Sequence, residues 1–139
     1  MEPLFEVELQ YQKGKAKVTD SETKVVGGKY LASGIGTIKG NQVEGTVSWD
    51  LFENSSEKFC DAHFAGIIET QNDVHVNFDV FGFFLKTEGS IWKLKASVIF
   101  HADATQYSWL NSPLMFWEGH FDMGTYHHYY KVYSSFNDS

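Results

Sequence analysis

Two segments of the sequence place a carboxylate and an imidazole two residues apart. Asp61 precedes His63 in one segment, and Glu118 precedes His120 in the other. Residues two apart on a strand share a face. Each carboxylate can therefore hold the tautomer of its imidazole and tune its pKa toward neutrality, as a general base requires. We take Asp61, His63, Glu118 and His120 as candidate catalytic residues, with a solvated strand face as the alternative for each pair.

A second group of residues offers hydrogen-bond donors and apolar walls for a ligand. Tyr107, Trp109 and Asn111 follow one another at two-residue spacing in a segment that otherwise reads as a loop. Tyr and Asn can donate hydrogen bonds to a carbonyl or a developing oxyanion, and Trp can form an apolar wall. The alternative is a structural corner in which Tyr107 and Asn111 bond to backbone groups. Three further aromatic residues complete the predicted ligand-binding set, namely Trp49, Phe81 and Phe116.

Motifs for metals and organic cofactors are not found in the sequence. Glu118, His120 and Asp122 share a face and are ligand types that divalent metals accept, but they lack the His-x-His pattern with a trailing Glu that is usual in barrel metal sites. Gly34-x-Gly36 with Gly40 is not a dinucleotide fingerprint, because its spacing is wrong and no helix follows. We therefore predict neither a metal nor a cofactor.

The composition of the chain limits the kinds of partner that it could bind. The chain has 139 residues, a net charge of −7 and 17% aromatic residues, with 12 Phe, 7 Tyr and 4 Trp. All 11 basic residues are Lys, and Arg supplies the planar fork that grips phosphates and guanine edges. An acidic chain without Arg is a poor candidate for nucleic acid or for an anionic membrane surface. The excess of aromatic residues favours a small hydrophobic or aromatic molecule as the partner.

Period-two alternation dominates the chain and predicts strands. About eight are expected, over residues 4–11, 27–40, 43–51, 61–70, 74–81, 92–100, 114–122 and 126–136, with 102–113 as a long loop. The length fits one domain, spanning residues 1–139. Several short strands at regular spacing suggest a sandwich or a barrel. We favour an all-β, closed antiparallel barrel of lipocalin-like size, whose interior is large enough to hold one small ligand.

The chain also resembles a family of small β-barrel proteins, DUF3237 (UPF0311). The resemblance is carried by segments distributed over nearly the whole chain: Leu4–Val7, Gly27–Tyr30, Val43–Val47, Asp61–Phe64, Tyr107–Asn111 and Val132–Tyr133. The Tyr-x-Trp-Leu-Asn segment at Tyr107 is the most specific of these. The family's basic residue after Asp-Ala is His63 here. The resemblance implies a barrel fold and no particular activity.

These observations favour a cofactor-independent acid–base enzyme. Isomerisation, cyclisation or elimination of a small hydrophobic or aromatic oxygenated metabolite would suit an aromatic cavity with an Asp–His pair. The alternatives are a non-catalytic binder or carrier of an apolar ligand, and an interaction protein that uses exposed aromatic residues. A homodimer stays open. The single cysteine, Cys60, and the absence of a recognisable secretory signal or long apolar run make a cytoplasmic location the default expectation.

Overall fold

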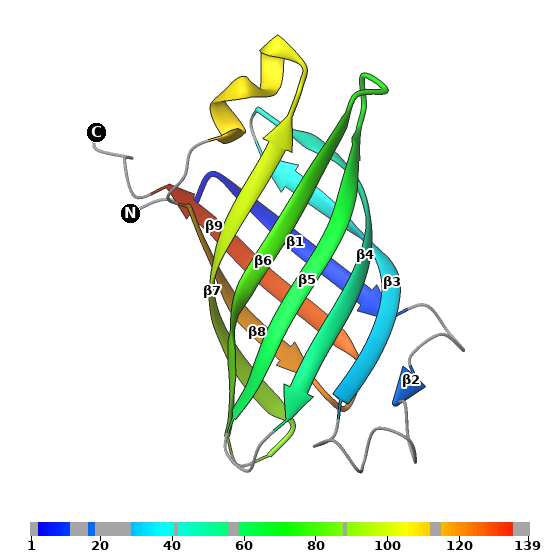
Figure 1. Cartoon of the computed structure of the whole chain (residues 1–139), viewed down its shortest axis with the longest axis vertical. Coiled ribbons are helices and arrows are strands. Elements are labelled where there is room, and N and C mark those ends of the chain that lie inside the picture. The colour runs from blue at the N-terminus through cyan, green and yellow to red at the C-terminus, as the bar shows by residue number, and fades with distance from the viewer. Residues whose placement is uncertain are drawn as a thin grey trace.

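The computed structural model describes residues 3–11, 17–18, 29–40, 42–55, 59–87, 89–111 and 115–134. Its elements are nine strands and one 3-10 helix, in the order β1 (Phe5–Tyr11), β2 (Lys17–Val18), β3 (Lys29–Gly40), β4 (Glu44–Ser55), β5 (Phe59–Thr70), β6 (His75–Lys86), β7 (Ile91–Ala102), η1 (Thr105–Asn111), β8 (Met115–Asp122) and β9 (His127–Ser134). Figure 1 shows the strands tilted around a common axis, with η1 beyond the end of β7.

The strands form a closed antiparallel barrel of eight strands, as predicted. From β3 to β9, each strand pairs with the next strand along the chain. Strands β7 and β8 also pair, although η1 lies between them in the sequence. Strand β1 closes the ring because it pairs with β9 along one edge and with β3 along the other. The short β2 also pairs with β3, at Leu31 and Tyr30. A closed ring leaves no strand edge unpaired along most of its length.

Alternation along each strand sorts side chains into an apolar interior and a mixed outer face. Strand β7 is the clearest case, since every second residue from Trp92 to Ala102 is buried and the residues between them are exposed. The interior contains large aromatic side chains from nearly every strand. Those less than 2% exposed include Phe64, Phe84, Trp117 and Tyr130. Burial of this apolar area is the main stabilising contribution to the barrel.

Interior glycines lie directly across from interior aromatic rings. Gly34 is the register partner of Trp49, Gly66 of Phe78, and Gly119 of Tyr130. A Cβ atom added at Gly66 would lie 2.7 Å from the Phe78 ring, and one at Gly119 would lie 2.8 Å from the Tyr130 ring. Small residues opposite large ones allow a tapered barrel interior to be filled. These glycines are therefore required by packing.

The segment predicted as a loop over 102–113 contains the 3-10 helix η1, and this part of the prediction was wrong. A 3-10 helix has three residues per turn, so residues two apart do not share a face. Tyr107 and Leu110 are buried, whereas Trp109 is only partly buried against the core. The helix therefore packs over one end of the barrel.

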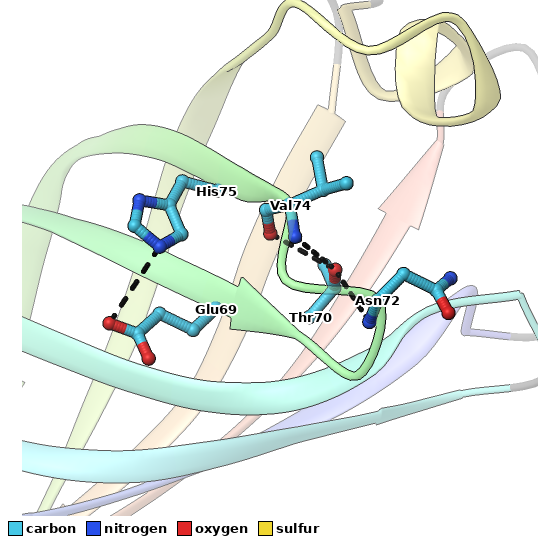
Figure 2. A network of polar contacts seen from close by, with 5 residues as sticks. All are labelled: Glu69, Thr70, Asn72, Val74 and His75. Carbon is cyan, nitrogen blue, oxygen red and sulfur yellow. Dashed lines mark hydrogen bonds and ion pairs between the residues drawn. The ribbon is translucent and has the colours of Figure 1, made fainter.

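The hairpin between β5 and β6 is tied to the same end of the barrel. As Figure 2 shows, the Thr70 hydroxyl donates to the Val74 carbonyl at 3.0 Å and accepts from the backbone N–H groups of Val74 and Asn72. The Asn72 side-chain amide donates to the Tyr107 hydroxyl at 3.3 Å. This bond links the hairpin to η1.

Candidate functional site

A histidine and a tyrosine are paired inside the barrel. His128 and Tyr130 occupy successive inward positions of β9 and are both 0% exposed. The Nδ1 atom of His128 lies 2.5 Å from the hydroxyl oxygen of Tyr130. The hydroxyl donates to Nδ1 in one imidazole tautomer and accepts from Nδ1–H in the other. Buried polar groups need such partners, because leaving one unsatisfied costs about 1–3 kcal/mol.

Aromatic rings from β4, β5, β6 and β8 surround His128. We call the four rings around His128, from Trp49, Phe64, Phe84 and Phe121, the aromatic cage. The Phe121 ring stacks on the imidazole with centroids 4.3 Å apart. Trp49 and Phe64 meet it edge-on at 5.4 Å and 5.5 Å, and Phe84 lies at 6.2 Å. The cage excludes water from the imidazole and sets a low local dielectric.

Burial controls the charge of His128. Loss of water around the ring lowers the pKa of His128 well below its usual value of 6.5, and His127 and His120 lower it further. Desolvation disfavours the charged form of an imidazole. The ring is therefore neutral near pH 7. A strongly perturbed titratable group inside an apolar interior is a functional-site candidate.

Trp117 adds an unused hydrogen-bond donor to the same interior. Its indole N–H is buried and has no hydrogen-bond partner in the part of the chain that the structure describes. Its ring lies 5.5 Å from that of Tyr130 and 6.4 Å from that of Phe64. An acceptor that is not supplied by these residues, such as a ligand oxygen or a water, would satisfy this donor.

Three small residues lie beside Trp117 in one row of the interior. Ala62, Gly82 and Ala96 are successive register partners on β5, β6 and β7, and Ala96 pairs in turn with Trp117. Within the described residues, the buried polar or charged side chains are limited to Thr70 and His128. A group bound in this interior would therefore have to be neutral and largely apolar.

The four predicted catalytic residues lie on the outer face of the barrel and not in its interior. Asp61 is exposed, and Glu118 and His120 are partly exposed on β8. The carboxylate that contacts the His63 imidazole is Asp79 of β6 rather than Asp61, with Nε2 and Oδ1 3.1 Å apart. His63 also stacks on Phe81 at 4.3 Å. Asp61 and His63 are thus on β5, and Glu118 and His120 are on β8. Both pairs face solvent.

The predicted ligand-binding residues are divided among three places. Trp49 belongs to the aromatic cage, and its indole N–H donates to the Ile35 carbonyl at 3.1 Å. Phe81 and Phe116 are 49% and 40% exposed on the outer face. The remaining three, Tyr107, Trp109 and Asn111, lie in η1.

The side chain of Asn111 is engaged with the backbone. Its Oδ1 accepts from the Ala102 N–H at 2.8 Å, and its Nδ2 donates to the Ala102 carbonyl at 2.9 Å. Asn111 thus bonds to backbone groups, as in the structural-corner alternative. Both ends of the amide are therefore committed to holding η1 against the end of β7.

Sequence reasoning missed His128, Tyr130 and Trp117. A signal for the first two was present: His128 alternates with Tyr130 and Val132, so it shares a strand face with an apolar residue and is separated from His127. A histidine in phase with the apolar face of a strand is buried with that face.

The described ranges contain neither a cluster of metal-ligating side chains nor a helix that could span a membrane. No group of three or more His, Cys, Asp or Glu residues there could hold a metal ion. The described part of the chain also contains no helix that is long and apolar enough to cross a membrane.

The fold places the chain in the class of closed, eight-stranded antiparallel β-barrels. No protein-family model matches the chain, and no curated protein matches its sequence. Thus no family model supports the resemblance to DUF3237. The likeness that stands is to small β-barrel proteins of known structure.

Several crystal structures share this barrel. A β-barrel-like protein from Acinetobacter baumannii is 16% identical with a TM-score of 0.76, over 96% of this chain and 93% of that one. A protein of unknown function from Clostridium acetobutylicum is 14% identical with a TM-score of 0.78, over 96% of both chains. An enzyme from Penicillium herquei is 20% identical with a TM-score of 0.63, over 95% of this chain and 92% of the enzyme. Likenesses at these identities establish the fold alone.

Proposed function

We propose that the chain is a small-molecule-binding β-barrel that acts as a cofactor-independent acid–base enzyme, an isomerase, cyclase or lyase, on a small hydrophobic or aromatic oxygenated metabolite. The proposed site is the interior around His128. The observation that carries it is the contact of 2.5 Å between His128 Nδ1 and the Tyr130 hydroxyl inside the aromatic cage. One of the structural neighbours is an enzyme, which agrees with a catalytic role.

Each polar group in this site has a distinct part in the proposed chemistry. The Trp117 N–H would donate to a ligand carbonyl oxygen and stabilise charge that develops on it. Neutral His128 would take a proton from the carbon beside that carbonyl, and Tyr130 would orient the imidazole. In an isomerisation the same proton returns to another carbon, so the reaction balances without any further reactant. The apolar cage would strengthen these interactions by excluding water.

The outer face offers an alternative location for the same chemistry. His63 and Asp79 lie 3.1 Å apart there, and both side chains are 36% exposed, so a substrate could reach them. A flat exposed face, however, confines a small molecule poorly and leaves charges screened by water. We therefore favour the interior and keep the His63–Asp79 pair as the competing site.

The alternative function is a non-catalytic binder or carrier. The same apolar interior would hold a ligand, and the Trp117 N–H would only orient it. A binder and an enzyme differ in what happens when His128 is replaced. Only an enzyme would lose proton transfer while it keeps affinity for the ligand.

A direct test of proton transfer needs no knowledge of the natural substrate. The probe is 1-tetralone, a neutral aromatic ketone with acidic protons beside its carbonyl. It is incubated with the protein in D2O, and NMR follows loss of the C2 protons. We expect the wild-type chain to accelerate exchange and His128→Gln to lose at least tenfold of that acceleration. The matched surface variant His63→Asn should keep the wild-type rate.

Calorimetric titration separates binding from catalysis. We expect Trp117→Phe to weaken 1-tetralone binding about tenfold, the loss of roughly one buried hydrogen bond, and to leave binding of naphthalene, which has no acceptor, unchanged. Binding of 1-tetralone without exchange would support the carrier. Loss of exchange in His63→Asn but not in His128→Gln would move the site to the outer face.

A further inference from the structure

An apolar patch lies on the outer face of the barrel, with its side chains on strands β4, β6, β7 and β8. We call the six side chains that form it the outer patch. Each is between 40% and 59% exposed, and they are Phe52, Phe81, Phe83, Leu85, Ile99 and Phe116. Large side chains carry about 150–250 Å² each, so six half-exposed ones present on the order of 500 Å² of apolar surface. Patches of that size on soluble proteins mark interaction sites.

Two phenylalanines of the outer patch are already held by ring contacts within a single chain. Phe52, His63 and Phe81 are register partners across β4, β5 and β6. Ring centroids lie 5.8 Å apart between Phe52 and His63, and 4.3 Å apart between His63 and Phe81. Asp79 holds the other side of the His63 ring. Side chains that are fixed before association lose less entropy on binding.

Charges flank the outer patch in a pattern that complements itself. Asp61 of β5, Phe83 of β6 and Lys95 of β7 are successive register partners, and all three point outward. A negative side chain thus lies on one side of Phe83 and a positive one on the other. A surface with this arrangement is matched by a copy of itself rotated about the line of β6.

We propose that the outer patch is the interface of a homodimer, with the β6 strands of two copies facing each other across a two-fold axis parallel to the strand. Such an axis lays β5 of one copy over β7 of the other. Asp61 then faces Lys95 of the second copy, and the symmetry makes this pair twice. Phe81, Phe83 and Leu85 each meet their own counterparts. The proposed contact combines the apolar side chains of the patch with the charges on its rim, as protein interfaces commonly do.

Asp79 sets one limit of the proposed contact. It is the next outward residue of β6 before Phe81, so the same axis would bring it toward its own counterpart. Two like charges facing each other oppose association. The contact therefore extends from Phe81 toward Leu85, and Phe83 is its central residue. Truncation at the centre of an interface has the largest effect.

Sedimentation velocity over a range of concentrations tests the interface. We expect the wild-type chain to be a dimer at micromolar concentration and Phe83→Glu to raise the dissociation constant by more than tenfold. The matched control is Ile35→Glu, which changes an apolar side chain that is 58% exposed on β3 and outside the patch. This control should remain dimeric. Circular dichroism should show all three chains folded.

Charge reversal tests the orientation of the two copies. Asp61→Lys alone and Lys95→Glu alone should each weaken the dimer several-fold, because each places like charges opposite one another. The double variant should restore the wild-type dissociation constant. A monomeric wild-type chain, whatever else covers the patch, overturns the proposal, as does a dimer that survives Phe83→Glu. A double variant that fails to restore dimerisation contradicts the axis along β6.

Discussion

His128 and Tyr130 share a hydrogen bond on the inner face of β9, with the His128 Nδ1 atom and the Tyr130 hydroxyl oxygen 2.5 Å apart. The neighbouring His127 faces outward. The chain thus has two kinds of histidine. His63, His101 and His127 lie within 4 Å of carboxylates on the outer face, where water screens them. His128 is enclosed by rings and lacks such screening. Its properties therefore depend on the barrel interior.

The pH dependence of stability should report His128. Its pKa in the folded chain lies below that in the unfolded chain, so between the two values the unfolded chain binds the extra proton. The free energy of unfolding should fall as the pH decreases from about 6.5 toward the folded pKa, by up to ~1.4 kcal/mol per pH unit. Denaturant unfolding at several pH values measures this slope.

The matched comparison isolates that contribution from other titrating groups. His128→Gln should lose the His128 component of the slope below about pH 6.5, whereas His63→Asn should keep it. Identical pH dependence in the wild type and His128→Gln would mean that the pKa of His128 is not lowered in the folded chain.

Removing the Tyr130 hydroxyl should destabilise the barrel. Tyr130→Phe keeps the ring but takes away the group that contacts His128 Nδ1, and we expect a loss of about 1–3 kcal/mol in the free energy of unfolding. The control is Tyr126→Phe, at a residue that is 52% exposed. Chemical denaturation compares the two. Equal stability of both variants would show that the His128–Tyr130 contact contributes nothing measurable.

Interior glycines should tolerate alanine poorly. A Cβ atom at Gly119 would lie 2.0 Å from the Tyr129 carbonyl oxygen and 2.8 Å from the Tyr130 ring, so Gly119→Ala should cost about 1–3 kcal/mol or more. At Gly124 the nearest atom is the end of the Asp122 side chain at 3.1 Å. Gly124→Ala should therefore change the melting temperature little. A thermally unperturbed Gly119→Ala would contradict the packing described here.

Asn111 should behave as a structural residue of η1. Asn111→Ala removes both hydrogen bonds to the Ala102 backbone, and we expect a loss of about 1–3 kcal/mol in stability. Asn111→Asp should recover only part of this loss, since a carboxylate accepts from the Ala102 N–H but cannot donate to its carbonyl. Affinity for 1-tetralone should be unchanged in any folded fraction. A loss of affinity without a loss of stability would favour the ligand role predicted from the sequence.

Period-two alternation predicted the strands, and their number favoured a closed barrel over a sandwich. Phe64 and Ile68 are on the opposite face of β5 from Asp61 and His63, as alternation predicts, and both are buried. The helix η1 could not be predicted in this way, because a single short helix at the end of a barrel has too few turns for a helical period to be recognised. Its stabilisation by Asn111 and Asn72 depends on contacts between distant segments.

The choice of interior face explains why the four predicted catalytic residues lie outside. Alternation tells which residues share a face but not whether a polar face lines a ligand-filled interior or meets water. The Asp61–His63 face meets water because the opposite face has apolar side chains such as Phe64 and Ile68, which gain by burial, whereas burying Asp61 and His63 would cost their hydration. His128 and Trp117 require knowledge of which rings surround them, and that comes only from the closed barrel.

Crystals of the chain soaked with 1-tetralone provide the most direct test of the interior site. We predict density for the ketone inside the barrel, with its carbonyl oxygen within hydrogen-bond distance of the Trp117 indole nitrogen and its ring against the aromatic cage. Density for the ketone only on the outer face, beside His63 and Phe81, with the interior unchanged, would contradict the proposed site.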